Sequence, residues 1–318
     1  MNITREPGIS VLALNPAVDI SYEIQQLVVD RKVRAESTRY SPGGNGINVA
    51  RSLAELGMPF RCYSVVGGES GDLLLRLLGD SLGENHTIFR VDGETRVNAT
   101  LLQKFPRGQY EVDSAGPEIT SDVLEDLTGS FLSGCGAGFG VLTGSIPPGV
   151  PDDYVGRLAQ QIWEQGGRAV VDAYGPVLST ALEAQPYLVR LNRYVLEMAI
   201  KRSLESIEAV ASSARELQRG GVSCVCITLG ADGAILVDEN NSLHCSVPRI
   251  HVQSTVGCGD ALLAGLLAAA HRGEDSRAML QLGVLCGSAT ATRPGTELFR
   301  REDFENLSGR LEMTVLDI

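Results

Sequence analysis

The sequence lacks several features that would assign it quickly to a class. Its longest nearly pure apolar run, ALLAGLLAAA at 261–270, is far short of the roughly 20 residues that a membrane span needs. Its 27 Lys and Arg residues form no cluster and the net charge is −12, which argues against a nucleic-acid surface. The N-terminus has no basic start or small-residue cleavage site, so it does not resemble a secretory signal. We expect a cytoplasmic protein with neither a membrane nor a nucleic-acid partner.

Metal and nucleotide motifs are also missing. The seven cysteines are an odd number, are widely spaced and form no C-x-x-C pair, so neither a disulfide framework nor a zinc site is indicated and buried free thiols are expected. The sequence has no Walker A motif, no G-x-G-x-x-G after the first strand, no H-E-x-x-H and no G-x-S-x-G. We expect structural or exposed roles for the scattered histidines, which are His86, His244, His251 and His271.

What is present is a repeated alternation of short apolar runs and longer helical patterns. The apolar runs do not alternate with polar residues, which is typical of parallel strands covered on both faces. Strand and helix in repeated succession predict an α/β fold with a mostly parallel central sheet and helices on both sides. The predicted strands are 9–15, 60–66, 140–145, 168–174, 186–192, 222–230 and 249–255, and the clearest helices are 46–56, 72–80, 152–165 and 206–219.

Two stretches, 18–40 and 88–113, break this rhythm. Both are rich in residues that favour strands, and the second carries the hairpin-like PRGQ at 106–109. We predict that they pair as a small antiparallel sheet, a lid outside the main body of one domain over 1–318. Exposed edges of such a lid favour a homodimer through it.

Two glycine-rich turns lead into predicted helices. In SPGGNGINVAR (41–51), Gly43, Gly44 and Gly46 leave backbone N–H groups unshielded at a helix start, which suits an anion or a hydroxyl-rich ligand. A tight turn without a ligand explains this stretch equally well. In STVGCGDALLAG (254–265), Asp260 follows a similar turn. Asp260 is either the cap of its helix or an acid that accepts a proton while the helix-start amides hold a phosphoryl group.

Six motifs in order resemble the ribokinase-like sugar kinases, also called the phosphofructokinase B family. The resemblance spans nearly the whole chain and implies a three-layer α/β/α domain with a small β-sheet lid, and ATP and Mg²⁺ as cofactors. The motifs are NPAVD (15–19), PGGNGINVARSLAELG (42–57), TRVN (95–98), TGSIPPG (143–149), TLGADGA (228–234) and STVGCGD (254–260).

The resemblance implies a role for each matching residue. Asp260 is the expected catalytic base, and the amides of Gly257, Cys258 and Gly259 form the anion hole. The sugar site is expected to contain Asp19, Gly44 and Asn48, and the nucleotide site Asn192, Thr228, Gly230 and Gly233.

The form of the motifs is similar to the branch that acts on phosphorylated hexoses. These enzymes are 1-phosphofructokinase, tagatose-6-phosphate kinase and the minor 6-phosphofructokinase. An acidic protein must place cations locally to bind a sugar phosphate. Arg96 matches the family's phosphate-binding arginine, and Lys32 and Ser145 are further candidate contacts. The alternative for Lys32 is a solvated strand edge.

One departure from the family pattern affects the expected metal shell. Where the family has K-P-N-x-x-E, this chain has Arg190, Leu191, Asn192 and then Val195 in place of the glutamate. Glu197 lies two residues further on, about 200° around a helix. Two alternatives therefore stay open. The protein is either an active phosphohexose kinase or a pseudokinase that binds a sugar phosphate or a nucleotide and has a regulatory role. Asp260 favours the kinase and Val195 the pseudokinase.

Overall fold

A large mixed sheet forms the body of the protein. The computed structural model describes residues 8–318, apart from the side chains of 305 and 306. The sheet order is β14-β13-β12-β11-β10-β9-β8-β1-β4-β5. Its parallel strands are β1 (Ile9–Ala13), β4 (Phe60–Val66), β5 (His86–Arg90), β8 (Phe139–Thr143), β9 (Arg168–Asp172), β10 (Leu188–Asn192) and β11 (Cys224–Thr228). The antiparallel strands are β12 (Ala234–Asp238), β13 (Ser242–Cys245) and β14 (Met313–Val315).

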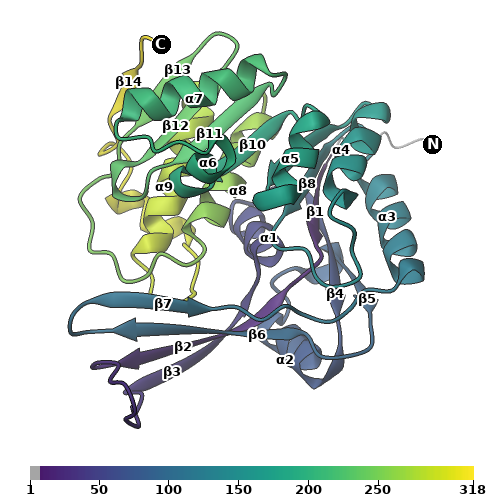
Figure 1. The fold of residues 1–318 in the computed structure, drawn as a ribbon, viewed down its shortest axis with the longest axis vertical. Coiled ribbons are helices and arrows are strands. Elements are labelled where there is room, and N and C mark those ends of the chain that lie inside the picture. The colour runs from purple at the N-terminus through teal and green to yellow at the C-terminus, as the bar shows by residue number, and fades with distance from the viewer. Residues whose placement is uncertain (1–7) are drawn as a thin grey trace.

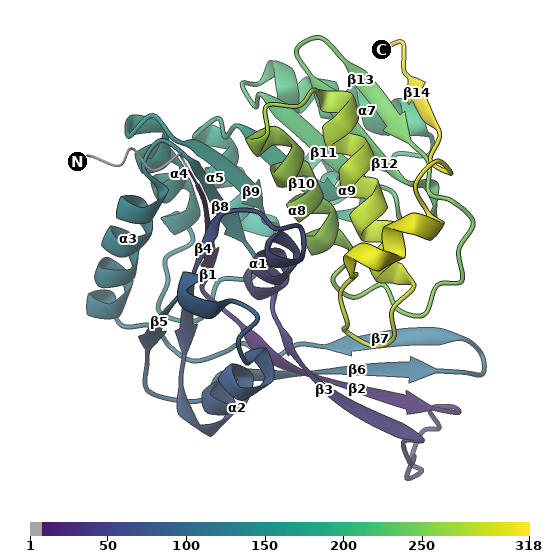
Figure 2. The same cartoon turned by 180° about the vertical axis from the view of Figure 1, so that it is seen from behind.

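Helices cover both faces of this sheet, which confirms the predicted mostly parallel α/β architecture. In β1, Ile9, Val11 and Ala13 enter one hydrophobic core while Leu12 enters the other. The strand reads as continuously apolar because alternate side chains point to opposite buried faces. The first core packs α1 (Asn45–Glu55), α2 (Gly68–Leu78), α8 (Cys258–His271) and α9 (Ser276–Ala291), and Figure 2 shows α1, α8 and α9 on that side. The second packs α3 (Ser121–Cys135), α4 (Tyr154–Glu164), α5 (Gly175–Glu183), α6 (Arg193–Ile200) and α7 (Ile207–Arg219), and the last four lie in front in Figure 1.

A second sheet of four strands, which we call the lid sheet, extends from the body (Figure 1). Its order is β3-β2-β6-β7. The prediction of an antiparallel sheet holds within each stretch, for β2 with β3 and β6 with β7, but is wrong for the pairing between the stretches, because β2 and β6 are parallel. The expected lid segment 88–113 begins too early, because 88–90 belong to β5, which pairs with β4 in the large sheet. The strands of the lid sheet are β2 (Ala17–Ile24), β3 (Ser37–Gly43), β6 (Arg96–Gln103) and β7 (Gly108–Val112).

The strand predicted at 249–255 is not formed. Its backbone bonds elsewhere, because the Gln253 N–H donates to the Ala291 carbonyl at the end of α9 and the Thr255 N–H donates to the Gln109 side chain in the lid sheet, at 3.4 Å. The segment therefore connects the body to the lid without joining either sheet.

The membrane and targeting expectations concern the whole chain. Within residues 8–318, none of the helices combines the length and apolar character that crossing a membrane requires. Residues 1–7, on which the signal-peptide expectation partly rests, lie outside the described residues. The cytoplasmic address stays a prediction.

Candidate active site

The candidate site lies where the carboxyl ends of the parallel strands meet the lid sheet. In open α/β sheets this edge is where ligands bind. β1 leads through Asn15 and Pro16 directly into β2 of the lid sheet, so the body and the lid join at this edge. Two cavities open here, and they share Arg190, Thr255 and Gly259 among their lining residues.

The carboxylate of Asp260 does not cap its own helix. Gly257 is the N-cap of α8, with a φ of 76° that favours glycine, and among the residues that the structure describes no side chain caps this helix. Asp260 instead accepts two hydrogen bonds from α1, one from Asn45 Nδ2 and one from Asn48 Nδ2, both at 2.9 Å. These bonds hold the carboxylate beside the glycine turn.

Burial changes the acidity of Asp260. Its side chain is only 5% exposed. Burial raises the pKa of this carboxyl from its ordinary 3.8 to about 7, with a further rise from Asp172, while the bonds from Asn48 and Asn45 and the charge of Arg190 oppose the rise. A carboxyl with a pKa near neutrality is suited to exchange a proton with a substrate.

The lid sheet contributes a second carboxylate, that of Asp19 on β2. Asn98 Nδ2 on β6 donates to Asp19 Oδ1 at 3.1 Å. Gly43 faces the Asp19 carboxylate so closely that a Cβ at that position would have no room. Burial raises the pKa of Asp19 to about 6, and the bond from Asn98 opposes this.

Arg96 is fixed at the start of β6. Its Nε donates to the Asn15 carbonyl at 3.0 Å and its Nη1 to the Ser114 carbonyl at 3.4 Å. The residue is 7% exposed, and burial lowers its pKa although Asp113 and Asp19 oppose the shift. The backbone contacts leave the guanidinium in one orientation at the base of the lid.

The first cavity, which we call the polar cavity, has a volume of about 190 Å³. Arg96 and Asp260 both line it, so the two groups open into one space and not into separate ones. Its other lining residues are Asp19, Gly44, Asn45, Asn48, Asn98, Thr100, Glu111, Asp113, Arg190, Thr255, Val256, Gly257 and Gly259.

The second cavity, which we call the apolar cavity, has a volume of about 360 Å³. Its walls include Val247, Ile250, Leu262 and Val284, together with four residues that the family resemblance assigned to the nucleotide. At Gly233 a Cβ would collide with the Cys245 carbonyl, so this position requires glycine. Those four residues are Asn192, Thr228, Gly230 and Gly233.

Arg190 stands between the two cavities. Its Nη1 lies 3.1 Å from Asp172 Oδ2 and its Nη2 donates to Thr228 Oγ1 at 3.4 Å. The guanidinium fills the space that a Cβ at Gly259 would need. Within the described part of the chain, its buried Nε has no hydrogen-bond partner. A cation is thus fixed beside the glycine turn, at the boundary between the cavities.

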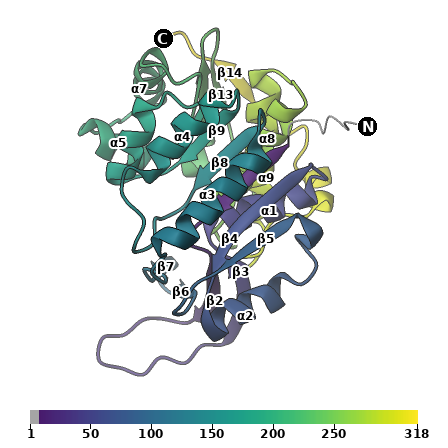
Figure 3. The same ribbon diagram turned by 90° about the vertical axis from the view of Figure 1, so that its right-hand side faces the viewer.

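Two predicted sugar-site residues lie outside the polar cavity. Lys32 is exposed in the loop 25–36 between β2 and β3, which extends from the lower end of the molecule in Figure 3. Ser145 is separated from the polar cavity by Asn15 and Arg96. Its hydroxyl accepts from Asn15 Nδ2 at 2.9 Å, and the carbonyl of Asn15 accepts from Arg96, which lines the cavity.

Val195, which stands where the family has a glutamate, makes an apolar contact. Val195 packs against the hydrophobic core, and its N–H donates to Asn192 Oδ1 at 2.8 Å as the cap of α6. Glu197 does not substitute for it, because its carboxylate accepts from the Leu204 N–H at 2.8 Å and from Arg193.

Within the described residues, no group of three His, Cys, Asp or Glu side chains lies close enough to hold a metal ion.

Several residues of the site were not assigned roles from the sequence. Asn45 and Asn98 stand within the quoted motifs at 42–57 and 95–98 without a role of their own. Asp172 ends β9 and Arg190 lies two residues before the end of the adjacent parallel strand β10, and this shared position near the carboxyl edge was the signal that could have paired them. The contact of Glu111 with the cavity required the lid sheet to be known.

A lid over a carboxyl-edge cavity, with a buried carboxylate beside a glycine turn, defines a sugar kinase of the ribokinase-like class. The model of the family described as pfkB family carbohydrate kinase matches residues 12–302. The chain belongs to this family, and it is an ATP-dependent sugar kinase.

Relatives and solved structures agree with this assignment. The chain is 32% identical over 304 residues to ATP-dependent 6-phosphofructokinase isozyme 2 of Mycobacterium tuberculosis, covering 94% of this chain and 88% of that protein. The structure of phosphofructokinase-2 from Escherichia coli in complex with substrates and products matches with a TM-score of 0.89 at 30% identity, covering 94% and 98% of the two chains. Ribokinase of Thermotoga maritima shares the fold, with a TM-score of 0.76 at 20% identity over 94% and 98%. The predicted ribokinase-like fold and family are confirmed.

Proposed function

We propose that this protein transfers the γ-phosphate of ATP to a hydroxyl of a phosphorylated ketohexose, with Asp260 as the base. The candidate acceptors are fructose 1-phosphate, fructose 6-phosphate and tagatose 6-phosphate. The observation that carries the proposal is the single polar cavity lined by both Arg96 and Asp260, adjoining an apolar cavity across Arg190 and Gly259. The name of the relatives, 6-phosphofructokinase, supports a sugar phosphate as acceptor.

The side chains of the polar cavity divide the work of binding and proton transfer. The carboxylate of Asp19, held by Asn98, accepts hydrogen bonds from sugar hydroxyls. The guanidinium of Arg96 pairs with the phosphate that the sugar already carries, as arginine does in fixed geometry. Asp260 takes the proton from the attacking hydroxyl. Its raised pKa makes its carboxylate a stronger base than that of an ordinary aspartate, while part of it stays ionised near neutral pH.

The glycine turn and Arg190 act on the nucleotide side. The N–H groups of Gly257, Cys258 and Gly259 stand at the start of α8, where backbone amides and the helix dipole favour a phosphate. Arg190 adds a fixed positive charge where negative charge develops on the transferred phosphoryl group. The apolar cavity suits the base of ATP, with glycines allowing the backbone to approach the phosphates.

Mg²⁺ fits this site as a companion of ATP. The ion is commonly held by one or two carboxylates together with substrate phosphates and water, and it does not need a cluster of three protein ligands. Asp260 lines the polar cavity and would face the ion, whereas the Asp172 carboxylate lines neither cavity and pairs with Arg190, and Val195 offers no lone pair. When bound, Mg²⁺ neutralises charge on the phosphates.

The proposal is tested by measuring ADP release with a panel of acceptors. The panel contains the three sugar phosphates together with fructose and ribose. We expect turnover with at least one phosphohexose and little with the free sugars. Turnover confined to free sugars would contradict the proposal that Arg96 binds the phosphate of the sugar. Binding of ATP and sugar phosphate without turnover would favour the pseudokinase, which Val195 makes the second candidate.

We also propose that the lid sheets of two copies pair. Asp19, Asn98 and Glu111 point into the polar cavity, so their neighbours along the strands point outward. Tyr40 and Val112 are 52% and 61% exposed on this outer face, and a second copy would cover them. Sedimentation of the wild type as a dimer and of Val112→Asp as a monomer is expected. A monomeric wild type would contradict the pairing. The outward-facing exposed residues are Tyr40, Val97, Tyr110 and Val112.

A further inference from the structure

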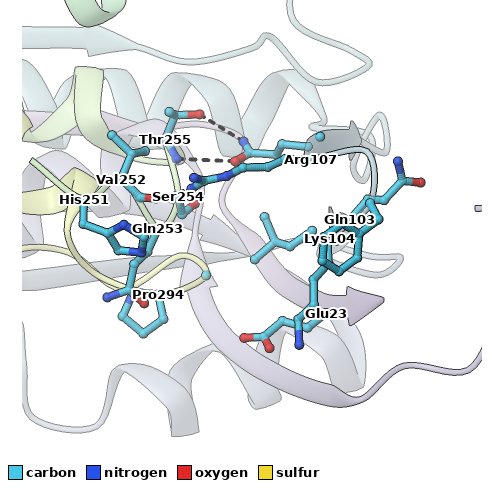
Figure 4. A pocket seen from close by; sticks show the side chains of 15 residues that line it. Glu23, Gln103, Lys104, Arg107, His251, Val252, Gln253, Ser254, Thr255 and Pro294 are labelled. Carbon is cyan, nitrogen blue, oxygen red and sulfur yellow. Dashed lines mark hydrogen bonds between the residues drawn. The ribbon is translucent and has the colours of Figure 1, made fainter. Parts of the chain in front are cut away.

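A third cavity of about 570 Å³ separates the β6–β7 hairpin from the segment 251–255 (Figure 4). The hairpin and the segment are joined across it by side chains. Gln109 Nε2 donates to Thr255 Oγ1 at 3.1 Å, and the Thr255 N–H donates to Gln109 Oε1 at 3.4 Å. Arg107 donates to the Val252 carbonyl beside them. One amide side chain of the lid therefore holds both the backbone and the hydroxyl of Thr255.

Thr255 connects this contact to the glycine turn. Its carbonyl accepts from the N–H of Cys258, at 3.4 Å, and Cys258 is one of the three residues proposed to hold the transferred phosphoryl group. Thr255 lines all three cavities. Residues 249–255 belong to no helix or strand, so the placement of Thr255 depends on the groups that it contacts.

Gln109 also connects to the polar cavity. The same Nε2 donates to Glu111 Oε1 at 2.5 Å, and Glu111 lines the polar cavity from β7. A chain of hydrogen bonds thus runs from a wall of the sugar site through Gln109 and Thr255 to the amide of Cys258. A ligand that moves the lid in the polar cavity would move or fix Thr255 through this chain.

We propose that Gln109 is a positioning residue that couples sugar binding under the lid to the order of the glycine turn on the nucleotide side. The inference rests on the proposed function for the identity of the two ligands. Gln109 touches neither ligand. It fixes Thr255 when the lid is closed, so a sugar phosphate in the polar cavity prepares the turn for the nucleotide. By linkage the nucleotide tightens sugar binding by the same factor.

The test measures this coupling by binding, so that it does not depend on turnover. The affinity for an ATP analogue with a non-transferable γ-phosphate is measured by calorimetry with and without saturating fructose 6-phosphate. We expect the sugar to tighten nucleotide binding in the wild type. In Gln109→Leu the tightening should fall by about fivefold, a modest value because these hydrogen bonds are exposed. In Gln109→Leu, affinity for the analogue alone should fall by no more than about twofold, because Gln109 touches neither ligand.

Two further variants separate positioning from a general loss of stability. Thr255→Val removes the hydroxyl but keeps the N–H, so it should lose part of the coupling and should not add fully to Gln109→Leu. Gln253→Leu is the matched control, because Gln253 lines the same cavity but its Nε2 donates to the Thr292 carbonyl and not to the lid. This control should keep the wild-type coupling.

The outcomes also separate this inference from the proposed function. Absence of any tightening in the wild type, or full tightening in Gln109→Leu, would overturn the positioning role even if the enzyme turns over phosphohexoses. Tightening that is lost in Gln109→Leu, together with no turnover of any acceptor, would support the positioning role while the proposed function fails.

Discussion

The polar and apolar cavities are built in different ways. The polar cavity is formed by side chains that bond one another across long stretches of sequence, such as Asn98 to Asp19 and Asn48 to Asp260. The apolar cavity is formed mostly by aliphatic side chains, glycines and backbone, as at Gly233 and Leu262. A network of buried hydrogen bonds fails when one partner is lost, whereas an apolar wall tolerates substitutions of similar volume.

The difference bears on how each cavity responds to substitution. Val195 and Cys258 both lie on the nucleotide side, where the backbone N–H groups of the capped helix and of the turn are unaffected by the side chain. The polar cavity keeps Asp19, Arg96 and Asp260. The predicted consequences of substitution should therefore be large in the polar cavity and small in the apolar one.

The largest effect is expected for Asp260→Asn. The variant keeps the shape of the side chain but cannot take the proton from the attacking hydroxyl. Its kcat should fall by at least about a hundredfold, as the loss of a general base implies. Affinity for the ATP analogue, measured by calorimetry, should stay within about threefold, because Asp260 contacts the nucleotide side only at the turn. A kcat close to that of the wild type would show that another group is the base.

A smaller effect is expected from pH. Burial raises the pKa of Asp260 to about 7, and the base acts only when ionised. The value of kcat/KM should therefore rise with pH and level off above about 7, since it reports the free enzyme. Below that pKa the carboxyl is protonated and activity should fall about tenfold per pH unit. A profile that bends only near the ordinary value of 3.8 would contradict the buried environment of this group.

The smallest effect is expected for Cys258→Ala. Cys258 lines the apolar cavity, and its backbone N–H, which donates to the Thr255 carbonyl, belongs to the glycine turn proposed to hold the phosphate. Removing the thiol should change kcat and the KM for ATP by less than about twofold, because the amide is kept. A loss of kcat of tenfold or more would mean that the apolar cavity tolerates substitution no better than the polar cavity.

The sequence predicted the body of the fold well because its signal is local. The strands predicted at 60–66 and 168–174 are short apolar runs between helices, and the structure has strands at 60–66 and 168–172. The strand expected at 249–255 was wrong because its composition suits a strand while its hydrogen-bond partners are Ala291 and Gln109, which are distant in sequence. Propensity cannot report such partners.

The candidate site shows the same limit. The family resemblance and the glycine turn identified Asp260 and Arg96, and the structure brings both to the polar cavity. Asn45 as a donor to Asp260 and Arg190 as the cation between the cavities depend on packing between α1, α8 and β10. Lys32 was expected as a contact of the sugar phosphate, but its loop lies outside the polar cavity.

The central claim is that Arg96 and Asp260 act on opposite ends of one sugar phosphate, and substrate preference tests it most directly. The values of kcat/KM for fructose 6-phosphate and for fructose are compared in the wild type and in Arg96→Met. The account predicts a loss of at least about tenfold with fructose 6-phosphate and less than about twofold with fructose, because a charge-assisted contact exists only with the phosphate. Equal losses with both sugars would contradict the claim.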